Sequence, residues 1–196
     1  MKQLLTGPVD TPLLGELTPP GDKSISHRAL IMACLARGQS RVEGLLDSAD
    51  VRATAGACRQ LGMTIQENGD EWLLEGVGAD GLLPPEAALD MGNSGTAMRL
   101  LTGVLAAQPF SSRLIGDESL SRRPMNRIVQ PLGRMGARIR TREGGTPPLE
   151  INGNPELQGI DYASPIASAQ VKSCLLLAGL YASGYTTVSE PLKSRD

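Results

Sequence analysis

The sequence is poor in aromatic residues, since Phe, Tyr and Trp make up 3% of the chain, with a single Trp and a single Phe. Proteins that bind single-stranded nucleic acid stack its bases on aromatic side chains, so this scarcity argues against that class of function. The formal net charge of −2 supplies no overall field that would attract nucleic acid or a membrane surface. Any affinity for anions must therefore be local, and the core must consist of aliphatic and small side chains.

Histidine and cysteine are also scarce. His27 is the only histidine, which excludes a metal site built from several histidines. The three cysteines, Cys34, Cys58 and Cys174, are far apart and form no CxxC pair. We therefore expect buried thiols in a reducing compartment rather than disulfides or a zinc site.

Long apolar runs are absent. The longest one, at 174–182, is far too short to span a bilayer. Segment 1–15 contains two prolines and no continuous apolar stretch, so we do not expect a signal peptide. These absences favour a cytoplasmic protein with no membrane partner. With 196 residues, of which 40% are apolar, the chain can form a sizeable globular core.

The chain does contain an internal repeat. Three segments, which begin at Lys23, Asn93 and Ser168, open with small and hydroxyl residues, place a basic residue one turn later and continue as Leu-rich helices. The stretches between them also match, because each runs through a strand, an amphipathic helix ending near Leu61 or Met135, and two strands. We therefore predict an α/β (α+β) fold of repeated units, closed about a pseudo-threefold axis with the small-residue helices buried.

The first helix start combines several polar groups. We expect Ser24 or Ser26 to cap the helix. Lys23, His27 and Arg28 then place cations at the positive end of the helix macrodipole, which is unfavourable unless an anion binds there. Backbone N–H groups, hydroxyls and cations together form a receptor for phosphate or carboxylate. The alternative is a capped surface helix whose cations are solvated.

Later segments carry related chemistry. Gly95 follows a polar turn before the second helix, Arg123 precedes a helix start predicted at Pro124, and Gln170 lies in the first turn of the third helix. Each segment alone is also typical of a capped helix or a plain turn. Because the repeat relates the helix starts, they could converge on one set of anionic ligands. Asp47 and Asp50 are expected to cap a helix rather than to act as an acid–base pair.

Four motifs then suggest a family. PGDKSISHR, LDMGNSGTAMR, DESLSRRPM and ASAQVKS occur in this order and resemble segments of the 5-enolpyruvylshikimate-3-phosphate synthase family. The resemblance implies two similar globules, each of three βαβαββ units, with the active site between them. Members are roughly twice as long as this chain, which would be the N-terminal portion. The resemblance implies that residues 1–17 are a strand segment belonging to the other globule or to the hinge. Residues 18–196 would form the N-terminal substrate-binding globule. Its units would lie at about 18–85, 86–155 and 156–196, and the third would be incomplete.

The resemblance also implies a reaction. Family members are transferases of the shikimate pathway of aromatic amino-acid biosynthesis, and they use no metal or organic cofactor. They transfer the enolpyruvyl group of phosphoenolpyruvate to the 5-hydroxyl of shikimate 3-phosphate and release phosphate. The herbicide glyphosate occupies the phosphoenolpyruvate site in sensitive members. A chain that lacks the second globule would be inactive alone and could require a separate chain that carries the C-terminal half.

Residue roles follow from the same resemblance. Lys23 would act in catalysis and contact both substrates, and Gln170 would bridge them. The residues implied for shikimate 3-phosphate are Lys23, Ser24, Arg28, Ser168, Ala169, Gln170, Ser194 and Arg195. Those implied for phosphoenolpyruvate are Lys23, Gly95, Arg123 and Gln170.

Two other functions stay open at this point. UDP-N-acetylglucosamine enolpyruvyl transferase shares the fold, but it carries Lys-Asn in the first motif and a reactive cysteine on a loop. Lys23-Ser24 and the helical positions of the cysteines in this chain argue against that enzyme. A stand-alone module that binds phosphorylated anions, or one half of a split assembly, is the alternative from a different class.

Overall fold

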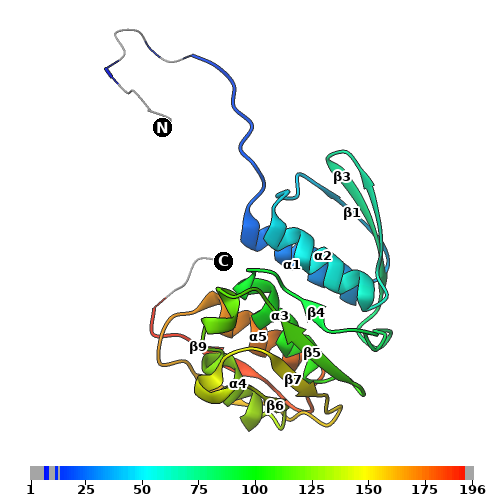
Figure 1. The fold of residues 1–196 in the computed structure, drawn as a ribbon, viewed down its shortest axis with the longest axis vertical. Coiled ribbons are helices and arrows are strands. Elements are labelled where there is room, and N and C mark those ends of the chain that lie inside the picture. The colour runs from blue at the N-terminus through cyan, green and yellow to red at the C-terminus, as the bar shows by residue number, and fades with distance from the viewer. Residues whose placement is uncertain (1–6, 9–11, 13, 193–196) are drawn as a thin grey trace.

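The chain forms successive runs of helices and strands in a computed structural model, which describes residues 7–8, 12 and 14–192 (Figure 1). The first run comprises α1 (Lys23–Leu35), β1 (Arg37–Glu43), α2 (Ala49–Gln60), β2 (Thr64–Asn68) and β3 (Glu71–Val77). The second comprises β4 (Leu89–Asp90), α3 (Gly95–Leu105), β5 (Ser111–Ile115), α4 (Asn126–Arg134), β6 (Arg138–Arg140) and β7 (Leu149–Asn152). The third comprises β8 (Asp161–Ala163), α5 (Ala169–Gly179) and β9 (Thr187–Ser189).

The strands among the described residues form three separate sheets. β1, β3 and β2 make an antiparallel sheet in that order, and β4, β5, β7 and β6 make a mixed sheet in which β4 is parallel to β5. β8 and β9 pair in parallel. The first two runs share the order helix, strand, helix, strand, strand. The α/β fold class is thereby confirmed, while closure about a pseudo-threefold axis stays a prediction.

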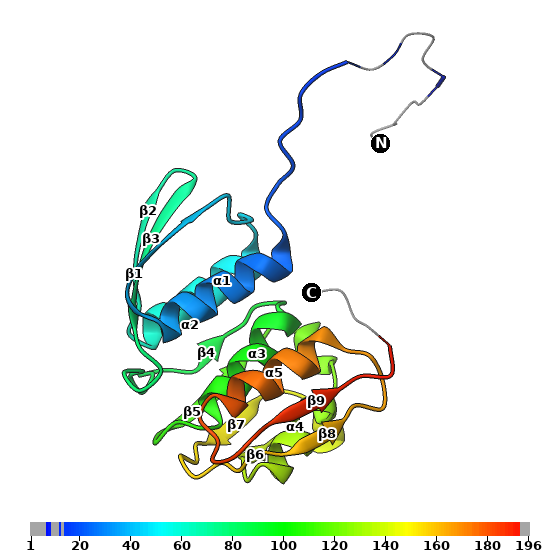
Figure 2. The ribbon, with the colours of Figure 1, turned by 180° about the vertical axis from the view of Figure 1, so that it is seen from behind.

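The helices rich in small residues form the interior. Nearly every residue of α3 is buried, as expected for a helix that is apolar all round. α3 packs along α5 (Figure 2), and the two backbones come very close at Gly103. A Cβ atom at that position would lie 2.2 Å from the carbonyl oxygen of Cys174, so only glycine fits there.

The helix caps differ from those predicted. Asp22, and not Ser24 or Ser26, caps α1, because its Oδ1 accepts from the N–H of Ile25 at 2.8 Å. Ser26 lies inside the helix, where its hydroxyl donates to the carbonyl oxygen of Asp22 at 2.7 Å. A side chain must belong to the residue just before the first turn to reach the free N–H groups, and Asp22 holds that place.

The start of α2 is likewise capped by a neighbour of the predicted residues. The Ser48 hydroxyl accepts from the N–H of Val51. Asp47 instead pairs with Arg52, and Asp50 lies within the first turn of the helix. α4 begins at Asn126, two residues beyond the predicted start.

The described helices include none that is long and apolar enough to cross a membrane. Cys34, Cys58 and Cys174 are all buried and unbridged, which confirms the prediction of buried thiols.

Candidate active site

The N-terminal ends of α1, α3 and α5 lie on the same side of the molecule (Figure 2). None of these three helices carries an acidic residue in its first turn, whereas α2 carries Asp50 there. The first-turn N–H groups and the helix macrodipole attract negative charge, and a carboxylate in that turn would compete with an anion. Asp22 already accepts from an N–H of α1, and Glu190 accepts from the N–H of Ser168 at the start of α5. The start of α3, which Ser94 caps, is therefore the one best suited to bind an anion.

Side-chain hydrogen bonds join the three helices on this side. Nη1 of Arg99 in α3 donates to Oε1 of Gln170 in α5 at 2.8 Å, and Nε2 of Gln170 donates to Oγ1 of Thr96 at 2.9 Å. Nη2 of Arg28 in α1 donates to Oγ of Ser173 in α5 at 2.8 Å. Helix α5 thus brings together two predicted site residues from different repeats, Arg28 and Gln170.

Arg123 reaches the start of α3 from the loop after β5. Its Nη2 donates to Oδ1 of Asn93 at 2.5 Å, and Nδ2 of Asn93 donates to Asp117 at 2.7 Å. The N–H of Leu120 and then Asn93 hold the pKa of Asp117 below its usual range, so this carboxylate stays charged and orders the loop. A Cβ at Gly95 would lie 3.5 Å from Nη1 of Arg123, which puts the guanidinium beside the first residue of α3.

A group of three arginines lies around this helix start. Burial lowers the pKa of Arg99, and the charges of Arg123 and Arg127 lower it further. Among the residues that the structure describes, no carboxylate forms an ion pair with any of the three. A bound anion would relieve this mutual repulsion, so the strongest electrostatic signal for an anion lies at α3.

At α1, the predicted excess of cations is only partly present. Lys23 is exposed and forms an ion pair with Asp50. His27 is fully buried, and burial lowers its pKa to about 4, so it is neutral. Counting His27 as a cation was therefore wrong, because the residue faces the core one helical turn after Lys23. Arg28 lies at the helix start and contacts α5.

The start of α5 is held by an acidic residue from beyond β9. The N–H of Ser168, which caps the helix, donates to Oε1 of Glu190 at 2.7 Å, and Nζ of Lys172 lies 3.0 Å from Oε2 of the same residue. Ala169 is the first residue of the helix. These contacts fix the α5 start relative to the strand that follows it.

The remaining predicted residues are less informative. Ser24 is exposed, and its carbonyl oxygen accepts from Nη1 of Arg28 at 3.2 Å. Ser194 and Arg195 lie outside the described residues. In the described part of the chain, no group of three or more His, Cys, Asp or Glu residues could hold a metal ion.

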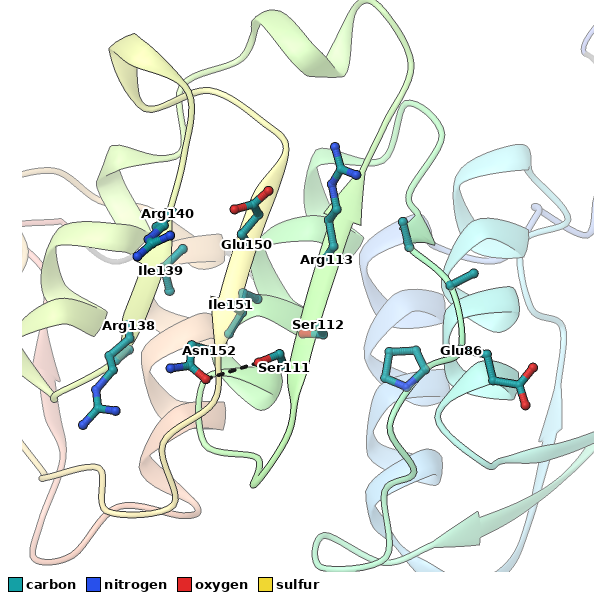
Figure 3. Close-up of a pocket in the computed structure, with 14 residues that line it drawn as sticks. Glu86, Ser111, Ser112, Arg113, Arg138, Ile139, Arg140, Glu150, Ile151 and Asn152 are labelled. Atoms are coloured by element: carbon teal, nitrogen blue, oxygen red, sulfur yellow. Dashed lines mark hydrogen bonds between the residues drawn. The ribbon is translucent and has the colours of Figure 1, made fainter.

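A hollow of about 980 Å³ lies elsewhere, on the outer face of the second sheet (Figure 3). Exposed Arg113, Arg138 and Arg140 line it, and Glu150 pairs in register with residues 113 and 140 on the neighbouring strands. It contains no predicted site residue. An apolar groove of about 240 Å³ between α1 and α5 includes Arg28 alone among them. Neither of these two hollows therefore brings the predicted residues together.

Comparison with known proteins identifies the family. The family model described as EPSP synthase (3-phosphoshikimate 1-carboxyvinyltransferase) matches residues 9–195. The chain belongs to the EPSP synthase family. The four motifs had indicated this family from the sequence, and the match confirms the interpretation.

Individual EPSP synthases are closely similar. The 3-phosphoshikimate 1-carboxyvinyltransferases of Xanthomonas campestris pv. campestris (strain B100) and Xanthomonas oryzae pv. oryzae (strain PXO99A) are 58% and 56% identical to the chain over 187 residues. These alignments cover 95% of this chain but 43% and 42% of the relatives. The solved EPSP synthase of Acinetobacter baumannii, at 52% identity, superposes with a TM-score of 0.90 over 93% of this chain and 41% of that one. The chain therefore spans less than half the length of these EPSP synthases.

Two residues at the site were missed from the sequence. Arg99 was overlooked although it follows Gly95 by four positions, the spacing that brings side chains together on a helix. Asp50 was interpreted as a cap, and only the packing of α2 beside α1 brings it to Lys23. Local sequence patterns in this EPSP synthase chain do not reveal which side chains of different helices come into contact.

Proposed function

We propose that the chain is the substrate-binding portion of an enzyme that transfers the enolpyruvyl group of phosphoenolpyruvate to the 5-hydroxyl of shikimate 3-phosphate. In this reaction the methylene carbon of phosphoenolpyruvate is protonated, and the hydroxyl loses its proton and attacks C2. The tetrahedral intermediate then loses phosphate and a proton of the new methyl group, which restores the double bond. Both substrates carry phosphate and carboxylate groups. The observation that best supports the proposal is the start of α3, where Arg99 and Arg123 lie beside a first turn without acidic residues, on the same side of the molecule as the starts of α1 and α5.

The proposed residue roles follow from the resemblance to the EPSP synthase family. Arg28, Ser24 and the start of α5 would hold shikimate 3-phosphate, and Gly95 and Arg123 would hold phosphoenolpyruvate. Lys23 and Gln170 would contact both substrates. Preorganised N–H groups and guanidinium groups would stabilise charge that develops during transfer. The full shikimate 3-phosphate set is Lys23, Ser24, Arg28, Ser168, Ala169, Gln170, Ser194 and Arg195.

The proposal extends to the rest of the enzyme. Residues 18–196 would form one globule, residues 1–17 would belong to the other globule or the hinge, and the second globule would supply the remaining catalytic groups. Until that half is added, in the same or a separate chain, we expect no turnover. Glyphosate would compete at the phosphoenolpyruvate site, and the enzyme would act in the cytoplasm.

Calorimetry tests whether this side binds substrate. Titration of shikimate 3-phosphate into the chain should give weak binding that Lys23→Ala removes. Arg138→Ala is the matched control, because it also deletes one positive charge but lies in the hollow on the outer face of the second sheet. Unchanged binding in Lys23→Ala would remove Lys23 from the site.

A mixing experiment tests the activity. The chain is combined with a polypeptide that supplies the rest of an EPSP synthase, and phosphate release is followed with both substrates present. Release that needs both substrates supports the transferase. Stable association without turnover would instead favour a role in assembly alone.

A further inference from the structure

The side-chain amide of Gln170 lies between two polar side chains of α3. Its Oε1 accepts from Nη1 of Arg99 at 2.8 Å, and its Nε2 donates to Oγ1 of Thr96 at 2.9 Å. Both bonds cross from α5 to α3 at the side where the helix starts lie together. The amide is thus held at both ends by the neighbouring repeat.

Only one of these two partners can determine which way round the amide lies. A hydroxyl both donates and accepts, so Thr96 could bond to either end of the amide. A guanidinium only donates, so Arg99 can face the carbonyl oxygen but never the NH₂ group. Rotating the amide by 180° would place the donors of Gln170 against the donors of Arg99. Arg99 therefore selects a single orientation.

Arg99 is itself held in place. Its Nη1 also donates to the carbonyl oxygen of Gly95, one turn earlier in α3, at 3.2 Å. A Cβ at position 95 would lie 2.7 Å from this Nη1 atom and would displace it. The absence of a side chain at Gly95 thus leaves room for the guanidinium that orients Gln170.

We propose that Arg99 is a positioning residue that directs the NH₂ group of Gln170 toward the ligand. Nε2 has a second hydrogen besides the one donated to Thr96, and this hydrogen serves a phosphate, carboxylate or hydroxyl oxygen of the substrates. The inference rests on the proposed function, which gives Gln170 contacts with both substrates. Arg99 acts through Gln170 and needs no contact of its own with substrate.

The orientation is tested by nuclear magnetic resonance on the ¹⁵N-labelled chain. The side-chain NH₂ signal of Gln170, assigned by its loss in Gln170→Ala, should shift in Arg99→Met and stay near its original position in Arg99→Lys, which keeps a donor. Arg127→Met is the matched control, since it removes a neighbouring charge and should leave the signal in place. A Gln170 signal that is unchanged in Arg99→Met would overturn the proposal.

Binding of shikimate 3-phosphate tests the second part of the proposal, that the oriented NH₂ group of Gln170 serves the ligand. Arg99→Met should weaken binding about tenfold, as expected for a charge-assisted hydrogen bond, whereas Arg99→Lys should largely restore it. In a Gln170→Ala background, Arg99→Met should cause no further loss. Equal losses in both backgrounds would mean that Arg99 contacts the ligand directly, which overturns the positioning role.

The two tests separate the inference from the function on which it rests. A chain that binds no shikimate 3-phosphate, but whose Gln170 signal responds to Arg99→Met, would count against the proposed function and for the orientation by Arg99. Unfolding midpoints of all variants are measured alongside. If Arg99→Met does not fold, Arg99→Lys takes its place in the test. A Gln170 NH₂ signal that lies at its unfolded-chain position in folded Arg99→Lys would contradict the proposal.

Discussion

Oγ1 of Thr54 lies 2.7 Å from Nδ1 of His27, and both side chains are fully buried. The Thr54 hydroxyl donates its hydrogen to the carbonyl oxygen of Asp50 at 3.3 Å, so it accepts from His27, whose Nδ1 carries the proton. Nε2 is then an acceptor and lies 3.4 Å from Oγ of Ser94, the residue that caps α3. One neutral imidazole thus connects α1, α2 and the start of α3.

His27 should make stability depend on pH. Burial lowers its pKa from 6.5 to about 4, although Asp50 partly opposes this. Between these two values the unfolded chain binds a proton that the folded chain does not, so stability is full above pH 6.5 and falls as the pH drops toward 4. We expect the free energy of unfolding, measured with urea, to fall by about 2 kcal/mol between pH 7 and pH 5.

The control for this prediction is His27→Gln. Its free energy of unfolding should fall by about 2 kcal/mol less over the same pH interval than that of the original chain. Because His27 is the only histidine, its ring signals in a proton spectrum need no assignment. A ring that titrates near pH 6.5 in the folded chain would contradict the buried, neutral state.

Two glycine-to-alanine substitutions in helices should have opposite effects. At Gly103 the new methyl would lie 2.2 Å from a backbone oxygen of α5, which cannot rotate away. We therefore expect Gly103→Ala to lower the free energy of unfolding by about 2–3 kcal/mol. At Gly56 in α2 an added methyl would have no neighbouring atom within 4 Å. Gly56→Ala should therefore raise the free energy of unfolding by about 0.5–1 kcal/mol. Thermal unfolding measures both, with a fall of several degrees expected for Gly103→Ala. A similar midpoint for the two variants would disprove the close approach of α3 and α5.

Gly95→Ala should affect glyphosate more than phosphoenolpyruvate in an enzyme that contains both halves. The methyl would crowd Nη1 of Arg99 at 2.7 Å and approach Arg123 at 3.5 Å. Crowding of this kind costs about 1–3 kcal/mol, and under the proposed function it acts on the phosphoenolpyruvate site, where glyphosate would bind. The measurement compares the glyphosate inhibition constant with the KM for phosphoenolpyruvate. An equal loss of both affinities would rule out this explanation.

The cysteines should resist thiol reagents while the chain is folded. Burial raises the pKa of Cys174 to about 12, and the contact with Cys34 together with burial raises the pKa of Cys58. The same contact lowers the pKa of Cys34, so this thiol is protected by its burial alone. Since the thiolate is the reactive form, native chain at pH 8 should react with Ellman's reagent far more slowly than urea-unfolded chain, where three thiols are expected. Rapid labelling of one thiol in the native chain would show that its helix is accessible.

Much of the fold could be predicted because the repeat made each element visible twice. The amphipathic helices end at Gln60 and Arg134, within one residue of the predicted Leu61 and Met135. Apolar periodicity and glycines mark such ends locally. The caps were harder, since Asp22, Ser24 and Ser26 are all suitable residue types and only the position of the first turn decides among them.

The site was predictable as a set of motifs but not as a set of contacts. Helix starts with hydroxyls and cations indicated anion binding, yet charge alone could not show that His27 faces the core. Partners from other elements, such as Asp50 for Lys23 and Gln170 for Arg99, depend on how whole helices pack. No local pattern contains that information.

The imidazole shared by three helices has an evolutionary consequence. Replacing Thr54 or Ser94 by an apolar residue would leave a ring nitrogen of His27 without its partner, and such buried losses are costly. Selection should therefore tolerate change at these three positions only in combination. We expect positions 27, 54 and 94 to co-vary when many relatives are aligned, even though they lie in different helices or helix starts.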